Sequence, residues 1–290
     1  MSNRLMCGVL SAGSRLPVGL RRWLQAAPIC RSLRARFLEY FARESGRQAY
    51  RVLSGPAKGL NMALNLPDEK TFWLGDYEPA AAGLLAAHTR PGDVCWDVGT
   101  YIGYFSLIMA QRSLQAVYCF EPLPNNQQRI AEQQGLNPNL KLSIVSLALG
   151  AAPGEADFLL MNELTMGKLA ASSFQSDRPA DGRIRVQVKT IDAAVSEGVA
   201  PRPDLLKIDT EGAEYQVLCG AQRTLAEHRP RILLEVHGCA EDPQLFELLT
   251  ASGYHWTVAE TGSRDAFAQA GQHIFCEWSG DPCPSAAPSP

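Results

Sequence analysis

VCWDVGTYIGY, residues 94–104, is the stretch that decides the fold of this 290-residue chain. An apolar run ends at Asp97, two glycines four positions apart follow, and apolar residues at helical spacing come next. This order predicts a strand, a tight turn and a helix. Gly99 and Gly103 allow the backbone to come close to a ligand, and the start of the helix offers free N–H groups. The stretch therefore predicts a site for a small organic ligand.

A second acid completes the pattern. The apolar run 116–121 ends at Glu121, which lies 24 positions after Asp97 (121 − 97). In nucleotide-binding folds, an acid at the end of the second strand binds ribose hydroxyls. Asp97 and Glu121 are therefore predicted to serve one site.

The spacing of the glycines bears on which ligand binds. A nicotinamide dinucleotide needs three glycines as G-x-G-x-x-G, whereas this chain has D-x-G-x-x-x-G, and Asp97 would repel a pyrophosphate. S-adenosylmethionine has a ribose and a cationic amino-acid end but no phosphate, so it accepts the acid. The alternatives are a nicotinamide cofactor and a turn that simply requires glycine.

The composition is that of a globular protein, with 46% apolar and 20% charged residues, and it suits one α/β domain with additions. No apolar run of about 18 residues predicts a membrane span. Eight scattered cysteines without a C-x-x-C pair favour a reducing compartment, so the expected location is the cytoplasm.

The first 51 residues are basic, with ten Arg and two Glu, a balance of +8 in a chain of net charge −3. A helix packed on the main domain with a solvated basic face explains this balance, and the alternative is contact with an anionic membrane surface. Nucleic acid is not expected, because no reader motif accompanies the basic residues. The oligomeric state is not predicted.

Strands alternate with helices along the chain, which predicts a parallel, doubly wound sheet. One or two helices are expected within 16–45, followed by a strand pair at 50–53 and 60–64. Further strands are predicted at 116–121, 140–149, 156–161, 184–190, 231–237, 254–260 and 273–278, and helices at 80–88, 124–134, 214–227 and 244–251. Another buried strand is predicted to end at Asp209.

Four blocks resemble the FkbM family of S-adenosylmethionine-dependent methyltransferases. They are DVGTYIG at 97–103, FEP at 120–122, KIDTEGAE at 207–214 with Gly220-Ala221, and LEVH at 234–237. The resemblance covers about residues 50–278. It implies an α/β fold, the Rossmann-like seven-stranded class I methyltransferase sheet with one late antiparallel strand. It also implies methyl transfer, which in this family includes O-methylation of hydroxyls on natural products and glycans.

The domain organisation follows from these patterns. Residues 1–49 are predicted to form an arginine-rich helical extension, and residues 50–278 the methyltransferase domain. The polar stretch 162–183 is interpreted as a lid on the substrate side or a surface loop. The Pro/Ser/Ala-rich tail 279–290 is expected to be disordered.

The cofactor residues are assigned by strand. Asp97 and Gly99 are expected at the amino-acid end, Glu121 at the ribose and Ala148 at the adenine. Tyr101 stands where the family often has Asn, so its hydroxyl would replace a side-chain contact or the contact would be lost. The full predicted cofactor set is Asp97, Gly99, Tyr101, Gly103, Glu121, Pro122, Ala148 and Glu78.

The chemistry is predicted at the ends of the fourth and fifth strands, where ligands bind in open α/β sheets. His237 or Asp209 is the expected general base, and Glu211 and Glu214 are expected to position it or the substrate. The structural alternatives are a strand-end imidazole bonded to a carboxylate and acids at a helix N-terminus.

No metal is expected at this site. A less favoured hypothesis is a divalent ion on Asp209, Glu211, Glu235 and His237 that lowers the pKa of the substrate hydroxyl.

The sequence thus predicts an S-adenosylmethionine-dependent methyltransferase that O-methylates a hydroxyl of a glycan or secondary metabolite by in-line displacement. A nicotinamide-dependent oxidoreductase and a non-catalytic S-adenosylmethionine-binding module are the alternatives. The acceptor itself is not predicted.

Overall fold

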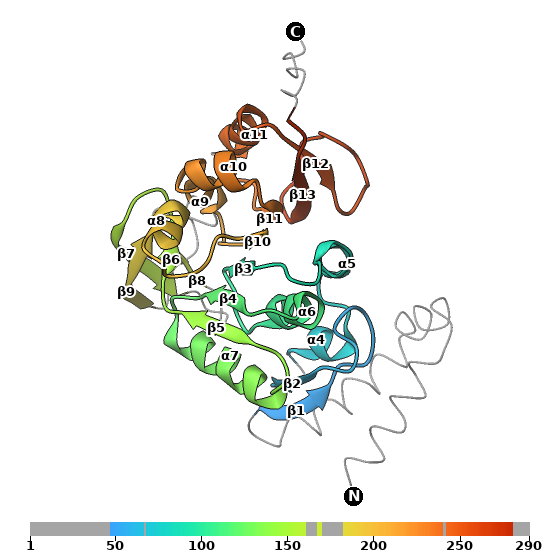
Figure 1. Ribbon diagram of the computed structural model, residues 1–290. Coiled ribbons are helices and arrows are strands. Elements are labelled where there is room, and N and C mark those ends of the chain that lie inside the picture. Colours follow the sequence, from blue (N-terminus) through green and yellow to red (C-terminus); the bar gives the residue numbers. More distant parts are fainter. Residues whose placement is uncertain (1–46, 67, 161–166, 170–181, 240–241, 281–290) are drawn as a thin grey trace, which may run out of the picture. The chain divides into compact units, whose positions relative to one another are not determined.

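The computed structural model (Figure 1) describes residues 47–66, 68–160, 167–169, 182–239 and 242–280. The chain divides into two compact units, residues 1–79 and residues 80–290, and each is described by itself. The predicted helices within 16–45 lie outside the described residues, as does nearly all of the predicted tail. The predicted division at residue 49 stays a prediction.

The described part of the first unit is a hairpin followed by a short helix. Strand β1 (Gln48–Arg51) pairs antiparallel with β2 (Asn61–Leu64), close to the predicted strand pair. Helix α4 (Lys70–Leu74), which the sequence did not predict, ends at Gly75 with φ 76°. A side chain at Gly75 would strike the backbone oxygen of Ser54, so the helix and the hairpin turn can meet only with glycine there.

The second unit is built on a seven-stranded sheet in the order β12-β13-β11-β10-β3-β4-β5, and the predicted sheet is confirmed. Strand β13 alone runs antiparallel to its neighbours. The strands are β3 (Cys95–Val98), β4 (Val117–Phe120), β5 (Leu142–Val145), β10 (Leu205–Ile208), β11 (Arg231–Val236), β12 (Tyr254–Val258) and β13 (Gln272–Trp278). The chain moves outward from β3 through β4 to β5 and returns to β10 on the other side of β3, so the strand order reverses between β3 and β10.

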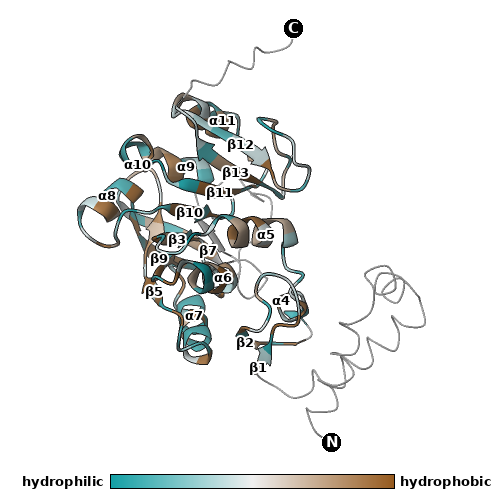
Figure 2. Cartoon of the chain, turned by 45° about the vertical axis from the view of Figure 1, so that its right-hand side comes forward, coloured by the Kyte–Doolittle hydropathy of each residue, from teal (hydrophilic) through white to brown (hydrophobic). Residues whose placement is uncertain are grey.

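Helices cover both faces of this sheet, with α6 and α7 on one side and α9, α10 and α11 on the other (Figures 1 and 2). The helices are α5 (Pro79–His88), α6 (Tyr104–Ser113), α7 (Pro124–Leu136), α8 (Ile191–Ser196), α9 (Glu214–Cys219), α10 (Gln222–His228) and α11 (Asp242–Ala251). Figure 2 shows α5 hydrophobic along most of its length and α7 mostly hydrophilic. Every residue of β3 and β10 is buried, as central parallel strands require.

Two predicted elements are split. The predicted strand 140–149 is β5 followed by β6 (Ala148–Leu149), which leaves the main sheet and pairs with β9 (Gly182–Lys189). The predicted helix 214–227 is α9 and α10, separated at Gly220. A side chain at Gly220 would lie 2.2 Å from the Gly150 carbonyl oxygen, so a close backbone approach breaks the helix there.

A second, four-stranded sheet has the order β6-β9-β7-β8, with β7 (Gly154–Leu160) and β8 (Gly167–Leu169). Its β7 and β9 form the antiparallel pair that the sequence predicts at 156–161 and 184–190. Most of the predicted lid lies outside the described residues. In the part of the chain that the structure describes, no helix combines the length and apolar character needed to cross a membrane.

Candidate functional site

The candidate site lies at the carboxyl ends of β3, β10 and β11, beside the reversal of strand order. In open α/β sheets ligands bind at this position. Gly99 follows β3 with φ 78°, and a side chain there would lie 1.7 Å from the Asp209 carbonyl oxygen. The glycine therefore lets the turn after β3, residues 99–103, pack against the end of β10. Gly103 has φ 88° and directly precedes α6.

Asp97 is fully buried on β3. Ser106 donates a hydrogen bond of 2.5 Å to its Oδ2, and the Lys207 Nζ lies 3.4 Å from its Oδ1. Burial raises the pKa of Asp97, and the ammonium of Lys207 and the Ser106 hydrogen bond oppose that rise. Within the described residues Asp97 Oδ1 accepts no hydrogen bond, and the Lys207 ammonium supplies its counter-charge. The direct contact of Asp97 with a cofactor stays a prediction.

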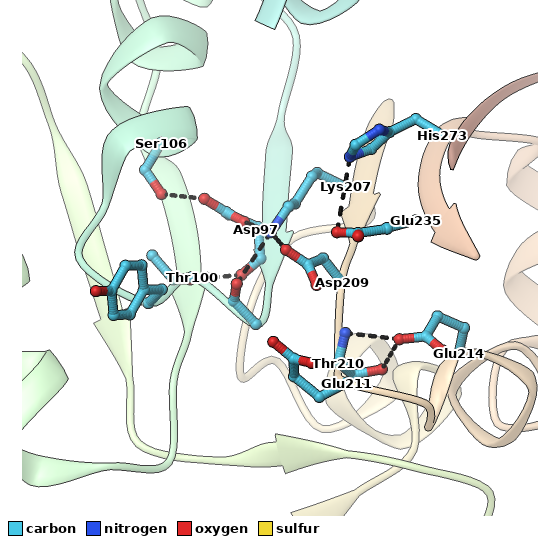
Figure 3. Close-up of polar contacts among 12 residues, drawn as sticks. Asp97, Thr100, Ser106, Lys207, Asp209, Thr210, Glu211, Glu214, Glu235 and His273 are labelled. Carbon is cyan, nitrogen blue, oxygen red and sulfur yellow. Dashed lines mark hydrogen bonds and ion pairs between the residues drawn. The ribbon is translucent and has the colours of Figure 1, made fainter. Parts of the chain in front are cut away.

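Lys207 occupies the middle of β10, opposite Asp97 in the register of the sheet. Its Nζ donates to the Gly99 carbonyl oxygen and to Asp209 Oδ2, each at 3.0 Å (Figure 3). No role for Lys207 was predicted from the sequence. The sequence did contain a signal for such a role, a lysine inside the apolar strand LLKI. A buried ammonium needs carboxylate or carbonyl partners.

Glu121 follows β4 and is buried. Its Oε2 accepts from the Tyr101 backbone N–H and its Oε1 from the Leu123 N–H, each at 2.9 Å. Burial raises the pKa of Glu121 to about 7, although these backbone hydrogen bonds oppose the rise. Each carboxylate oxygen can accept a second hydrogen bond, so ribose binding by Glu121 stays a prediction that its chemistry permits.

The other predicted cofactor residues differ in position. Tyr101 adopts φ 54° in the turn, a conformation that Asn tolerates better than Tyr. Pro122 is partly buried after β4. Ala148 lies in β6 rather than at the end of β5, and Glu78 belongs to the first unit. Cofactor contacts of these residues stay predictions.

His237 directly follows β11 and faces several carboxylates. Its Nε2 lies 3.5 Å from Glu211 Oε2, 3.7 Å from Asp209 Oδ1 and 3.8 Å from Glu235 Oε1. Its Nδ1 lies 3.2 Å from Glu214 Oε1. Burial lowers the pKa of His237, but Glu214, Asp209 and Glu235 outweigh burial and raise it to about 10. The imidazole is therefore protonated at neutral pH.

The four predicted catalytic residues do come together in space, and they have different environments. Burial tends to raise the pKa of Asp209, but Lys207 and His237 outweigh it, so the pKa of Asp209 is lowered. Burial, with the negative charge of Asp209, raises the pKa of Glu211 to about 7. Glu211 also has φ 54°, a strained backbone conformation of the kind found at functional sites.

Glu214 begins α9 and is buried. Its Oε1 accepts from the Thr210 N–H at 2.8 Å, the Thr210 hydroxyl at 3.0 Å and the Gly212 N–H at 3.2 Å. Glu214 thus holds the loop that carries Glu211. Glu214 Oε1 therefore accepts from backbone N–H groups at the start of α9, as the structural alternative expects, and it also faces His237. Its predicted role in positioning the base stays a prediction.

Two further residues extend this cluster along the sheet. Glu235 on β11 is opposite His273 on β13, and Glu235 Oε2 lies 3.7 Å from His273 Nε2 (Figure 3). Glu260 in turn pairs with His273 Nδ1 at 2.9 Å. Neither His273 nor Glu260 was predicted from the sequence, because the strand pairing that brings them here is not visible in it.

A divalent cation remains the alternative occupant of this cluster. Asp209, Glu211 and His237 each offer a ligand atom, and these atoms lie within 4.8 Å of one another. Lys207 engages one oxygen of Asp209, and the protonated His237 compensates the acids, so the carboxylates have cationic neighbours without a metal. The metal is therefore left to experiment.

Residues 97–256, more than half of the chain, match the methyltransferase FkbM domain. The chain belongs to the FkbM methyltransferase family. The resemblance predicted from the sequence is confirmed, and the residues matched include the Asp97 turn, Asp209 and His237.

Relatives of this FkbM chain include two methyltransferases. Hexuronic acid methyltransferase AglP of Haloferax volcanii is 26% identical over 167 residues, which cover 58% of this chain and 65% of AglP. The 2-O-methyltransferase NoeI of Sinorhizobium fredii is 28% identical over 153 residues, which cover 48% of this chain and 62% of NoeI. The chain thus spans slightly less than two thirds of each relative.

Among solved structures, a methyltransferase FkbM from Methylobacillus flagellatus KT is similar to this chain, with a TM-score of 0.43 and 16% identity. The match covers 64% of this chain and 43% of that structure.

Proposed function

We propose that this FkbM methyltransferase uses S-adenosylmethionine to methylate a hydroxyl group of a glycan or secondary metabolite. One observation carries the proposal. Where the strand order reverses, the ammonium of Lys207 contacts Asp97, the turn 99–103 and Asp209. The buried carboxylate of Asp97 favours a cationic amino-acid end and disfavours a pyrophosphate. Glu121 supplies acceptors for ribose hydroxyls.

The acceptor proton goes to Glu211 in this proposal. In-line displacement at a sulfonium methyl requires an aligned hydroxyl oxygen and a group that accepts its proton. A base works best when its pKa is near the working pH. The pKa of about 7 suits Glu211 to this task, whereas His237 with a pKa of about 10 is already protonated. His237 and Asp209 then orient the acceptor, and Glu214 holds the loop.

The acceptor class rests on the relatives. AglP is a hexuronic acid methyltransferase and NoeI a 2-O-methyltransferase, so a sugar hydroxyl is the first acceptor to test. A cluster of carboxylates with a protonated imidazole offers both acceptors and a donor for neighbouring hydroxyls.

The test begins with isothermal titration of the purified protein with S-adenosylmethionine, S-adenosylhomocysteine and NADH. Binding of the two adenosyl ligands alone is expected, and binding of NADH alone would refute the proposal. A labelled methyl donor then screens uronic acids, other sugars and phenolic hydroxyls. With an acceptor found, Glu211→Gln should lower turnover by on the order of 10²-fold or more, whereas Glu227→Gln on the exposed side of α10 should not. Cofactor binding without transfer to any acceptor would favour a non-catalytic module.

A further inference from the structure

The ammonium of Lys207 is almost completely enclosed, with 5% of the side chain exposed. It contacts three groups at or just beyond the carboxyl ends of β3 and β10: the Gly99 carbonyl oxygen, Asp209 Oδ2 and Asp97 Oδ1. The Phe105 ring, with its centroid 5.2 Å from Nζ, closes another side. Figure 3 shows Lys207 between Asp97 and Asp209. No other described lysine has such surroundings among the ion pairs of the second unit.

Stability does not explain this arrangement well. Replacing a buried ion pair with apolar residues is often neutral or stabilising, because desolvation of the charges offsets their attraction. Leu205, which lies on the same face of β10 as Lys207, is apolar and buried, so an apolar side chain would suit that face of the strand. A lysine that bridges two acids at the carboxyl ends of β3 and β10 therefore points to a role in the site.

We propose that Lys207 is a positioning residue that holds the cofactor turn, Asp97 and the acceptor-side Asp209 together through one ammonium. This inference rests on the proposed function. Through Gly99 and Asp97 the ammonium fixes the cofactor half of the site, and through Asp209 Oδ2 it turns Oδ1 toward His237. Without Lys207 two buried acids lose their shared cation.

The charges around this junction set the expected pH dependence. Lys207 faces Asp97, Asp209 and Glu211, and Asp97 also faces Cys119 and Glu121. Asp209 also faces His237 and His273, whose charges lower its pKa, whereas the groups around Asp97 other than Lys207 are acids and a thiol. Removing the ammonium therefore favours the protonated form of Asp97. A cationic ligand would then bind more weakly at pH 7 and regain affinity as Asp97 ionises at higher pH.

The first experiment is a double-mutant cycle in urea, which needs no cofactor. Lys207→Met leaves Asp97 as an uncompensated buried charge and should lower the unfolding midpoint, and adding Asp97→Asn should restore much of that loss. If Lys207→Met does not fold while the double variant does, the coupling is also supported. Additive effects, or two variants that both fail to fold, would overturn it.

The second experiment titrates wild type, Lys207→Met and the exposed control Lys141→Met with S-adenosylhomocysteine at pH 7 and pH 9. Lys207→Met should bind about tenfold more weakly or worse at pH 7 and regain most of the affinity at pH 9, and Lys141→Met should match wild type. An equal loss at both pH values would show a purely structural role and overturn the proposal. If wild type itself does not bind, the proposed function fails, and the urea cycle still decides whether Lys207 couples to Asp97.

Discussion

Replacing His237 with Gln should change how the stability of this protein depends on pH. His237 is buried among Asp209, Glu211, Glu214 and Glu235, and its pKa rises from 6.5 to about 10 on folding. A raised histidine pKa contributes stability that is fully present below pH 6.5 and is lost as pH rises toward 10. Between those values the folded protein holds one more proton than the unfolded chain.

The magnitude follows from that single proton. The free energy of unfolding should fall by about 1.4 kcal/mol for each pH unit in this window. The raised pKa values of Glu121 and Glu211, about 7, place their titration mainly below the window. Burial raises the pKa of Cys95 to about 12 and also raises those of Cys119 and Cys276, whereas thiols of the unfolded chain have a pKa near 9 and begin to ionise toward the upper end of the window. Because these acids and thiols are common to wild type and His237→Gln, the difference between the two slopes from about pH 7.5 to 8.5 reports His237.

Urea unfolding followed by fluorescence or circular dichroism at both pH values gives the slope. Wild type should lose about 1.4 kcal/mol across the interval, and His237→Gln should lose much less. The matched control is His88→Gln on α5, because burial lowers the pKa of His88 and leaves it neutral in both states above pH 7.5. Equal slopes for wild type and His237→Gln would refute the assignment of a protonated His237.

Two other perturbations test the site. Gly99→Ala should destabilise the protein by more than about 2 kcal/mol in urea and abolish S-adenosylhomocysteine binding, because φ is 78° and the new Cβ would lie 1.7 Å from the Asp209 carbonyl oxygen. Gly83→Ala on α5, where nothing lies within 4 Å, is the control and should keep both properties. Chelation with EDTA should leave methyl transfer unchanged. Loss of activity that a divalent ion restores would instead assign a metal to Asp209, Glu211 and His237.

The sequence predicted the main sheet well because its strands are short apolar runs bounded by glycine, proline and acids. Asp97, Glu121 and Asp209 each lie at or directly after the carboxyl end of a strand, where an apolar run gives way to an acid. Their convergence follows from the parallel arrangement. The late strands β12 and β13 were also found, since each is an apolar run after a turn.

The failures have a different physical origin. β6 leaves the main sheet to pair with β9, and the break between α9 and α10 lies where Gly220 approaches Gly150, so both features involve residues distant in sequence. Local patterns carry no information about such a contact. The role of Lys207 was missed for a similar reason, because the pairing of β10 with β3 decides which acids it meets.

The antiparallel pairing of β7 with β9 has a practical consequence for protein engineering. Leu160 pairs with Gly182, so the two ends of the segment between them lie next to each other on paired strands. A segment with adjacent ends can be exchanged for one of another length at little entropic cost to the rest of the chain. Segments from other FkbM enzymes that also supply a strand for the β8 edge of β7 can thus be grafted between residues 160 and 182.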